Sequence, residues 1–249
     1  MTFVINIAKV IGLFAEIILI KGECMELIQI AHIENGYKAK FGIPRQSGLA
    51  TAVESRIVME KGYGMEEAFR GIEDYDYLWL IWGFSKNVKK PFSATVKPPR
   101  LGGKIRMGVF ATRSPYRPNP LGLSSVKLER VEHDDKHGTV LVVSGADLLD
   151  GTPIYDIKPY LAYADAHAGA RSGFTDDHEF KKLEVVFPTE LLNQVPTSER
   201  EAVLEILEQD PRPGYDKGID REFKIAYGSV DITFVIEDER AKVIAVRNL

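Results

Sequence analysis

The feature that most limits the fold is a series of short apolar segments with a two-residue period between residues 25 and 163. "VESRIVME" (53–60) and "SSVKLERVE" (124–132) alternate apolar and polar side chains, and "TVLVVSGA" (139–146) is rich in β-branched residues. Such a pattern is typical of half-buried strands and not of helices. The strands that we predict, including the continuously apolar "YLWLIWGF", span 26–34, 53–60, 77–84, 106–112, 122–132 and 139–146.

These strands predict a mainly β fold, with a closed or nearly closed antiparallel β-barrel over residues 25–163. Antiparallel strands need only short connections, and closure removes exposed sheet edges. One short helix is expected within this region, in "GMEEAFRGI" (64–72). No glycine-rich GxGxxG turn follows a strand, which argues against a Rossmann nucleotide site.

The pattern changes after the barrel, and we predict a small α+β C-terminal domain over residues 164–249. An amphipathic helix is expected over 197–209, with Thr197 or Ser198 as its N-cap. Strands are expected over 181–187, 229–237 and 242–249.

The first 24 residues are apolar, but Lys9 and Glu16 interrupt every run long enough to span a bilayer. We interpret residues 1–24 as an N-terminal extension and expect no membrane partner; a helix that covers an apolar patch is the alternative. Cys24 is the single cysteine, which excludes an internal disulfide and favours a reducing, cytoplasmic location. The five histidines show no HExxH or HxH spacing, so we predict no metal.

Charge is unevenly distributed along the chain, although the net charge is only −4. Residues 77–128 contain no Asp or Glu, yet they contain ten of the 32 Lys and Arg residues. A local positive field of this kind attracts phosphate even on an acidic protein. The alternative is a solvated surface with no ligand, because neighbours in sequence need not be neighbours in space.

A stiff turn, "RSPYRPNPLG" (113–122), lies inside this basic segment. Its three prolines fix φ, remove N–H donors and bias each preceding residue towards an extended backbone. Arg117 and Asn119 are therefore held on a pre-organised loop. Arginine binds phosphate or carboxylate, and an asparagine amide both donates and accepts, as recognition of a base requires. A rigid strand connection without a ligand is the alternative.

Three further loops carry polar groups beside turn residues. "ADLLDGTPIYDIKPY" (146–160) supplies carboxylates after a strand, "FGIPRQSG" (41–48) places Pro-Arg-Gln between strands, and "QDPRPGYDKG" (209–218) follows the C-terminal helix. Carboxylates can accept hydrogen bonds from ribose hydroxyls or from a cationic group. Each of these loops is also explained by turn chemistry or a helix stop. No Ser-His-Asp order, phosphate loop or metal motif assigns a reaction.

Taken together, these loops resemble those of the TsaA-like (TrmO-type) family, β-barrel tRNA methyltransferases that methylate N6 of threonylcarbamoyladenosine beside the anticodon. The resemblance covers most of residues 25–218, in order, and the most specific part is the block from Pro-Pro-Arg to Pro-Asn-Pro. The matching text is "IPRQSG", "RGIEDYDYLWLIWGFS", "VKPPRLGGKIRMGVFATRSPYRPNPLGLSSVKL", "DLLDGTPIYDIKPYL" and "QDPRPGYDKG".

The resemblance implies S-adenosyl-L-methionine as methyl donor, tRNA as partner and a homodimer. It implies donor contacts from four segments: Pro44, Arg45 and Gln46; Ser85 and Lys86; Arg113 and Leu123; and Asp147, Leu148, Leu149 and Asp150. Some members of the family carry His-Gln where this chain has Ser85-Lys86, so we expect only contacts through the backbone to be kept there.

The same resemblance gives the substrate side its candidates. We predict that Asn119 orients the modified base, because neutral polar groups near the transferred methyl suit the loss of the sulfonium charge. The candidates for tRNA phosphate or the threonyl carboxylate are Arg117, Lys158, Arg212 and Tyr215. The residues leave two other functions open: a non-catalytic barrel that binds a nucleotide or RNA, and a small-molecule methyltransferase.

Overall fold

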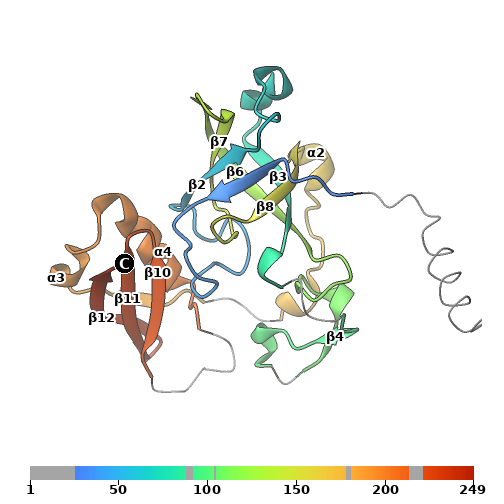
Figure 1. Cartoon of the computed structure of the whole chain (residues 1–249). Helices are drawn as coiled ribbons and strands as arrows, with labels where there is room; N and C mark the ends of the chain where they lie inside the picture. The colour runs from blue at the N-terminus through green and yellow to red at the C-terminus, as the bar shows by residue number, and fades with distance from the viewer. Residues whose placement is uncertain (1–25, 88–91, 104, 178–180, 213–220) are drawn as a thin grey trace, which may run out of the picture.

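The computed structural model describes residues 26–87, 92–103, 105–177, 181–212 and 221–249, and the predicted extension over 1–24 lies outside them. Six antiparallel strands form a closed barrel in the order β1-β2-β7-β6-β3-β8 (Figure 1). The barrel strands are β1 (Ala31–Glu34), β2 (Glu54–Met59), β3 (Tyr77–Gly83), β6 (Leu121–Asp134), β7 (Gly138–Ser144) and β8 (Pro153–Pro159). The predicted mainly β, closed antiparallel fold is confirmed.

Closure depends on β8, a strand that we did not predict. It pairs with β3 over most of its length and with β1 through Ala31–Ile154 and His32–Pro153. Its sequence, "PIYDIKP", begins and ends with proline and contains two charged residues, so it has the composition of a turn. Tertiary pairing with the apolar strand β3 overrides that local preference.

The barrel interior is filled by the side chains that the two-residue period places on one face. Ile33, Ile57, Leu80, Leu141 and Ile154 are each completely buried in one hydrophobic core. Strand β3 alternates less clearly because Trp79 and Ile81 on its outer face are themselves partly covered. Alternate inward side chains packed at crystal-like density are what hold a small barrel shut.

Two predicted elements in this region are wrong. Residues 106–112 form only a short strand, β5 (Met107–Gly108), followed by the 3-10 turn η5 (Val109–Ala111). The expected helix over 64–72 is instead two 3-10 turns, η1 (Glu66–Phe69) and η2 (Ile72–Asp74). Gly71 has φ 86° between those turns, a left-handed conformation that ends a helix.

The long connection from β3 to β6 carries the basic segment and forms a small lobe beside the barrel. Strand β4 (Thr95–Val96) pairs with β5, and the 3-10 turns η3 (Ser85–Asn87) and η4 (Pro99–Leu101) lie on either side of β4 in sequence. In Figure 1 this lobe lies below the barrel, opposite the C-terminal sheet.

The C-terminal part is a four-stranded sheet in the order β10-β11-β12-β9, with short helices packed against it. Its strands are β9 (Glu184–Val186), β10 (Phe223–Tyr227), β11 (Val230–Glu237) and β12 (Arg240–Asn248). Its helical elements are α2 (Ala162–Asp165), η6 (Gly173–Thr175), α3 (Thr189–Leu192), η7 (Thr197–Glu199) and α4 (Arg200–Glu208), of which α2 and η6 belong to the connection from the barrel. The strands predicted over 181–187, 229–237 and 242–249 are present as β9, β11 and β12, and β10 was missed.

The predicted helix over 197–209 is shorter and begins differently. Residues Thr197–Glu199 form a 3-10 turn after Pro196, so α4 starts at Arg200 with Glu199 as its N-cap residue and no side-chain cap. Neither Thr197 nor Ser198 caps α4, because both lie inside the preceding turn. Ala202, Val203, Ile206 and Leu207 form the buried face of α4.

The loop between β1 and β2 packs against the C-terminal core. Tyr37 packs edge-on against Tyr227, with ring centroids 5.6 Å apart, and the N–H of Gly228 donates to the carbonyl of Gly36 at 2.8 Å. The N–H of Ala52 donates to the Glu205 carboxylate at 2.7 Å. The loop between β1 and β2 is therefore held from both sides. The two separate cores support our proposed division of the chain near residue 164.

Gly122 gives a direct test of packing at the start of β6. A Cβ at this position would lie 2.2 Å from a ring atom of the buried Trp82. We expect Gly122→Ala to lower the free energy of unfolding by about 1–3 kcal/mol, because the ring must shift within a filled core. Chemical denaturation measures this. Gly108→Ala is the matched control, since its Cβ would meet no atom within 4 Å and its φ of −57° is ordinary. Equal midpoints for both variants would contradict the packing argument.

Among the residues that the structure describes, no helix combines the length and apolar character needed to cross a membrane. Within the same ranges, no three His, Cys, Asp or Glu side chains form a group suited to a metal ion.

Candidate functional site

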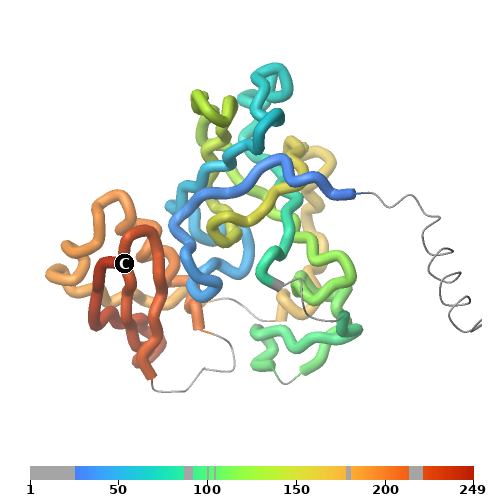
Figure 2. The backbone as a smooth tube through the Cα atoms, viewed as in Figure 1, coloured from blue at the N-terminus to red at the C-terminus, as the bar shows by residue number. Residues whose placement is uncertain are grey.

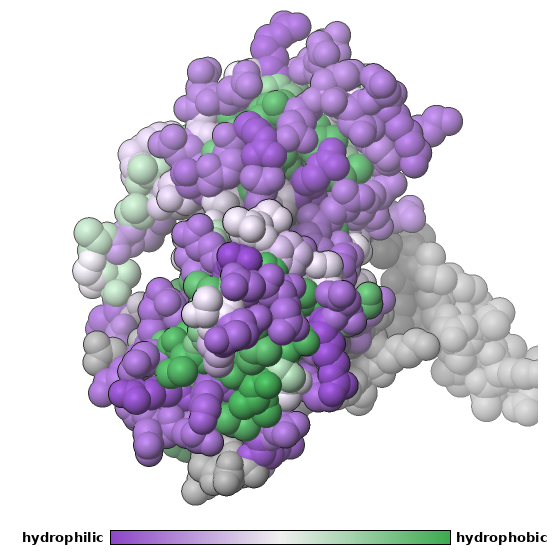
Figure 3. Space-filling model, turned by 90° about the vertical axis from the view of Figure 1, so that its left-hand side faces the viewer, coloured by the Kyte–Doolittle hydropathy of each residue, from purple (hydrophilic) through white to green (hydrophobic). Residues whose placement is uncertain are grey.

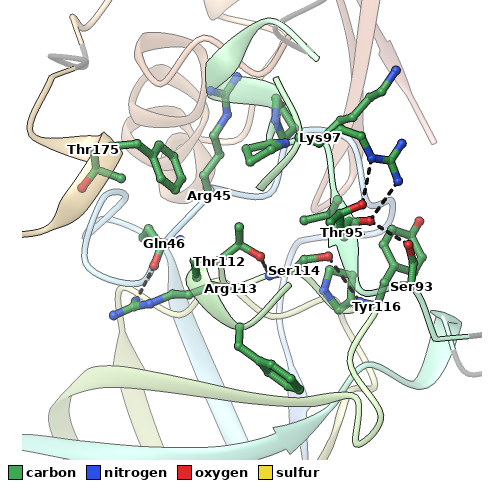
Figure 4. A pocket seen from close by; sticks show the side chains of 18 of the residues that line it. Arg45, Gln46, Ser93, Thr95, Lys97, Thr112, Arg113, Ser114, Tyr116 and Thr175 are labelled. Atoms are coloured by element: carbon green, nitrogen blue, oxygen red, sulfur yellow. Dashed lines mark hydrogen bonds between the residues drawn. The ribbon is translucent and has the colours of Figure 1, made fainter. Parts of the chain in front are cut away.

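The predicted donor segments come together at one end of the barrel. The N–H of Gly48, in the loop after β1, donates to the carbonyl of Gly145 after β7 at 2.8 Å. The N–H of Phe84, at the end of β3, donates to the carbonyl of Pro120 in the stiff turn at 2.9 Å. Arg113 of that turn donates to Gln46 (Figure 4). Segments separated by up to about a hundred positions thus surround one site.

Gln46 and Arg113 form its most direct link. The Arg113 guanidinium donates to the Gln46 side-chain oxygen across two loops, and both side chains line the same cavity (Figure 4). Because the Gln46 oxygen accepts this bond, its NH₂ group is left to donate to a ligand.

A second array runs from the barrel core to the loop after β7. Trp82 Nε1 donates to Ser124 Oγ at 2.9 Å, and Ser124 Oγ donates to Asp147 Oδ1 at 2.5 Å. Burial raises the pKa of the Asp147 carboxyl; the Ser124 hydrogen bond, a backbone hydrogen bond and the nearby Arg113 charge oppose the rise. A carboxyl group whose pKa is raised by burial beside a specific charged partner is a common sign of a functional site.

Leu148, Leu149 and Asp150 brace the loop between β1 and β2. The buried Leu148 presents its carbonyl to Asn35 Nδ2 at 2.9 Å, and Asp150 accepts from the Asn35 N–H at 2.9 Å and from Lys38 Nζ at 2.8 Å. The Leu149 carbonyl accepts from the Thr152 N–H at 3.1 Å. Asp150 is therefore already well supplied with donors, and its carboxylate acts here as a connection between loops.

Arg45 connects the same loop to the C-terminal part. Its Nη2 donates to the carbonyl of Arg212 at 2.8 Å, and Pro44 and Arg45 line a smaller cavity of about 290 Å³ with Arg212. Arg212 forms two hydrogen bonds to Asp210, of 2.8 and 3.0 Å, and both side chains are buried. This placement favours a positioning role for Arg212 over the tRNA contact that we predicted. Tyr215 lies outside the described residues.

Ser85, Lys86 and Leu123 lie at the exposed edge of the site. Ser85 and Lys86 begin the 3-10 turn after β3, and the Lys86 carbonyl accepts from Lys40 Nζ at 3.3 Å. The expected backbone contact of these two residues with the donor stays a prediction. Leu123 is 55% exposed on β6, although apolar side chains usually gain by burial.

The three remaining substrate-side candidates lie in two places: Arg117 and Asn119 share the stiff turn, and Lys158 is on β8. Arg117 donates to the Thr112 carbonyl at 2.6 Å and to the Val109 carbonyl at 3.3 Å, so it clamps its own loop. Asn119 is exposed, and its carbonyl accepts from the Leu121 N–H at 2.7 Å. Lys158 pairs with Asp156 at 2.9 Å on β8, opposite Trp79 near the other end of β3. It is roughly 13 Å along that strand from Gly83, since strands rise about 3.3 Å per residue.

The main cavity has a volume of about 1410 Å³ and lies between the donor loops and the small lobe (Figure 4). Arg45, Lys97, Arg106 and Arg113 supply its charge, and no carboxylate is found among the described residues that line it. Its aromatic lining comes from Phe110, Tyr116 and Phe174. The volume exceeds the 300–1,000 Å³ of a typical small-molecule pocket, leaving room for a second, larger ligand.

Sequence reasoning missed two walls of this cavity. One is the β4–β5 lobe with Thr95, Lys97 and Arg106, and the other is Ser172, Phe174 and Thr175 from the connection between barrel and C-terminal sheet. Figure 2 shows that connection running down past the small lobe before it reaches the C-terminal strands. The run of positive charge predicted the first wall in part. The polar stretch around residue 174 carries no local signal.

The residues present fit S-adenosylmethionine as a ligand. Asp147 offers a partly buried carboxylate for an ammonium or ribose hydroxyls, Gln46 offers an amide, and the half-buried Leu149 and the cavity-lining Pro44 offer apolar contact. None of these groups places a carboxylate in the main cavity itself, where the reacting nitrogen would enter.

Comparison with known proteins also points to a methyltransferase. A family model described as the tRNA-methyltransferase O N-terminal domain matches residues 32–166, and the TrmO C-terminal domain matches residues 181–249. The chain is 40% identical over 197 residues to a tRNA (adenine(37)-N6)-methyltransferase of Escherichia coli, covering 76% of this chain and 83% of that one. It is 42% identical over 173 residues to one of Eikenella corrodens, covering 69% and 97%.

A solved structure extends the similarity to the fold. The crystal structure of TrmO from Pseudomonas aeruginosa superposes with a TM-score of 0.74 at 30% identity, covering 92% of this chain and 100% of that chain. Both sequence and fold therefore agree over barrel and C-terminal sheet together. The chain belongs to the tRNA-methyltransferase O family.

Proposed function

We propose that this chain is an S-adenosylmethionine-dependent enzyme that methylates N6 of the tRNA adenosine next to the anticodon, in its threonylcarbamoyl form. The observation that supports this best is that the Pro-Arg-Gln loop and the stiff turn line one cationic cavity with no carboxylate among its described lining residues, while the segments after β7 and β3 are hydrogen-bonded to these two loops. Relatives with the printed activity tRNA (adenine(37)-N6)-methyltransferase, at about 40% identity, support the reaction type.

On the donor side, Asp147 holds the most specific position. Its carboxylate is fixed by Ser124 and kept close to Arg113, so it can accept from the donor's ammonium group or ribose. Gln46 and Arg113 hold the facing loops together, Pro44 and Leu149 contribute apolar contacts, and the buried Leu148 anchors their loop in the barrel core. The backbone of Ser85 and Lys86, with Leu123, completes this side. Asp150 and Arg45 act mainly by positioning the loop after β1.

On the substrate side, the charge of the cavity suits the polyanion tRNA. Arg106 and Lys97 line the cavity from the lobe, so phosphates can bind there without repulsion from carboxylates among the described lining residues. The threonyl carboxylate of the modified base would find the same positive field. Lys158 lies near the far end of the barrel and is proposed only as an outer phosphate contact.

Chemically, S-adenosylmethionine supplies an electrophilic methyl group on a sulfonium. The substrate nitrogen forms the new N–C bond as the C–S bond breaks, and the nitrogen then loses its proton. Positioning accounts for most of the acceleration in such an in-line transfer. Because the sulfonium charge is spread over sulfur, carbon and nitrogen in the transition state, a carboxylate beside the sulfonium would stabilise the ground state more, and neutral groups such as the Asn119 amide serve better there. Asn119 is proposed to orient the base.

The direct test uses purified full-length protein, labelled donor and two tRNA preparations, one carrying the threonylcarbamoyl group and one lacking it. We expect methyl transfer to the modified tRNA, with the product nucleoside identified by mass spectrometry. A folded protein that binds the donor by calorimetry but methylates neither preparation would overturn the assignment. Transfer to the unmodified tRNA at an equal rate would overturn the threonylcarbamoyl requirement alone.

We further propose a homodimer working in the cytoplasm, where tRNA is modified. The resemblance implies the dimer, and an apolar area on the C-terminal side of the molecule supports it (Figure 3). Val186 and Ile244 of this part of the chain are 37% and 39% exposed. Light scattering of the purified protein measures the assembly directly.

A further inference from the structure

Phe110 is an aromatic side chain that the barrel leaves outside. It is 71% exposed, yet it lines the main cavity, and its ring lies 6.5 Å from that of Phe92 in a stacked arrangement. Phe92 is itself 54% exposed. Single exposed apolar residues are common, but a stacked aromatic pair at the mouth of a charged cavity is a ready surface for a flat ligand.

The backbone beneath Phe110 is held rigidly. Val109, the preceding residue, is buried, and its N–H donates to the Ala94 carbonyl at 2.9 Å. The Val109 carbonyl accepts from Thr112 Oγ1 at 2.9 Å and from Arg117 at 3.3 Å. Local bonding therefore turns Val109 inward and fixes the direction in which Phe110 leaves the chain. A ring displayed in this way loses little conformational entropy when a ligand binds.

The surroundings of Phe110 are positively charged. The Arg117 guanidinium lies 5.5 Å from the Phe110 ring centroid, and Lys97 and Arg106 line the same cavity. Arg106 Nε is oriented by a 2.8 Å bond to Thr95 Oγ1. An apolar peptide would gain nothing from these cations. A nucleobase attached to a phosphate backbone matches both features, since bases stack on aromatic rings and phosphates bind Lys and Arg.

We propose that Phe110, backed by Phe92, is the stacking platform for an unpaired base of the RNA substrate, while Lys97 and Arg106 contact the adjoining phosphates. This inference rests on the proposed function, because it takes the substrate to be the anticodon loop of a tRNA. It assigns the small lobe between β3 and β6 a role in substrate recognition. The platform lies in the same cavity as Gln46 and Arg113, so a base stacked there is brought to the donor side.

The test measures binding of the full-length protein to a synthetic anticodon stem-loop RNA by fluorescence anisotropy, without donor. Phe110→Ala should weaken binding roughly 5- to 100-fold, the loss expected when one base loses its aromatic partner. Phe110→Trp should keep the affinity, and the fluorescence of the new indole should be quenched when the RNA binds. Wild-type affinity in Phe110→Ala, or no quenching in Phe110→Trp, would overturn the proposal.

Two comparison variants separate stacking from charge. Tyr163→Ala removes an aromatic ring that is 88% exposed on α2 and lies outside the cavity lining, and it should leave binding unchanged. Lys97→Ala should weaken binding and reduce the slope of log affinity against log salt by about one, whereas Phe110→Ala should leave that slope unaltered. A reduced slope in Phe110→Ala would mean that its effect is electrostatic, contrary to the proposal.

Failure of the inference and failure of the proposed function give different results. If the wild type methylates tRNA and Phe110→Ala has wild-type RNA affinity, the platform is refuted and the function stands. If the wild type binds the hairpin through Phe110 but transfers no methyl group, the platform stands and the function is refuted.

Discussion

Replacing Asn119 with alanine is expected to slow methyl transfer about 100-fold or more at saturating donor and tRNA, with donor affinity unchanged. Misplacement of a reacting group by about 1 Å is enough for such a loss. Asn119 lies between two prolines, and the neighbouring Pro120 carbonyl is bonded to Phe84 at the end of β3, so its backbone is fixed beside the donor segments. Its amide is exposed and neutral. Single-turnover transfer from labelled donor measures the rate, and calorimetry measures the affinity.

The matched control is Asn193→Ala, which removes another exposed asparagine, at the end of α3 in the C-terminal part. It should transfer methyl groups at the wild-type rate. A parallel fall of rate and donor affinity in Asn119→Ala would show that the turn has collapsed and that Asn119 is structural. An unaltered rate would remove it from the site.

The second large effect is expected from Asp147→Asn, which should lower donor affinity about 10- to 100-fold and stabilise the ligand-free protein at neutral pH. The affinity falls because a hydrogen bond to a charged group contributes about 1.5–3 kcal/mol. Stability rises because burial places the folded-state pKa of Asp147 above its unfolded value. The folded chain then holds the proton more tightly, and stability is lost as the pH rises from the unfolded towards the folded pKa. Asparagine does not ionise, so the variant does not lose this stability as the pH rises.

Calorimetry with donor and thermal unfolding across pH test this pair of effects. Asp156→Asn is the matched control, because Asp156 is a carboxylate on β8, the next strand in sequence, and its partner Lys158 is exposed. It should leave donor affinity within error. Wild-type donor binding by Asp147→Asn would place the donor elsewhere, and a lower unfolding midpoint would show that the carboxylate stabilises the apo fold.

The sequence predicted most of the barrel because its strands bury alternate side chains. β2 and β6 show this period, β7 is a continuous run rich in β-branched residues, and the observed bounds of all three lie within a few residues of those expected. β8 and β10 escaped prediction for different reasons. β8 is bounded by prolines and paired by context, and β10 is a five-residue strand that gains its stability only between β11 and the loop at Tyr37. Neither constraint is local.

The site was predictable only where chemistry is concentrated in short motifs. Pro-Arg-Gln, the stiff turn and Asp-Leu-Leu-Asp are each recognisable by an unusual combination of residues, and these three motifs do meet in space. Which of their residues face a ligand and which hold a loop was not predictable. Asp150 and Arg212 are residue types that often bind ligands. Here Asp150 is already hydrogen-bonded to Lys38 and Asn35, and Arg212 to Asp210. Only the folded arrangement distinguishes a group that faces a ligand from one that holds a loop.

The hydrogen bond from Arg45 to the Arg212 carbonyl couples the barrel to the C-terminal part through a ligand site. Thermodynamic reciprocity then requires that whatever steadies the Pro-Arg-Gln loop also steadies the C-terminal sheet, and the reverse. Donor occupancy should therefore slow amide hydrogen exchange in α4 and β10, far from any atom the donor touches. Methyl-donor supply would in this way regulate the local stability of a region that takes no part in the chemistry.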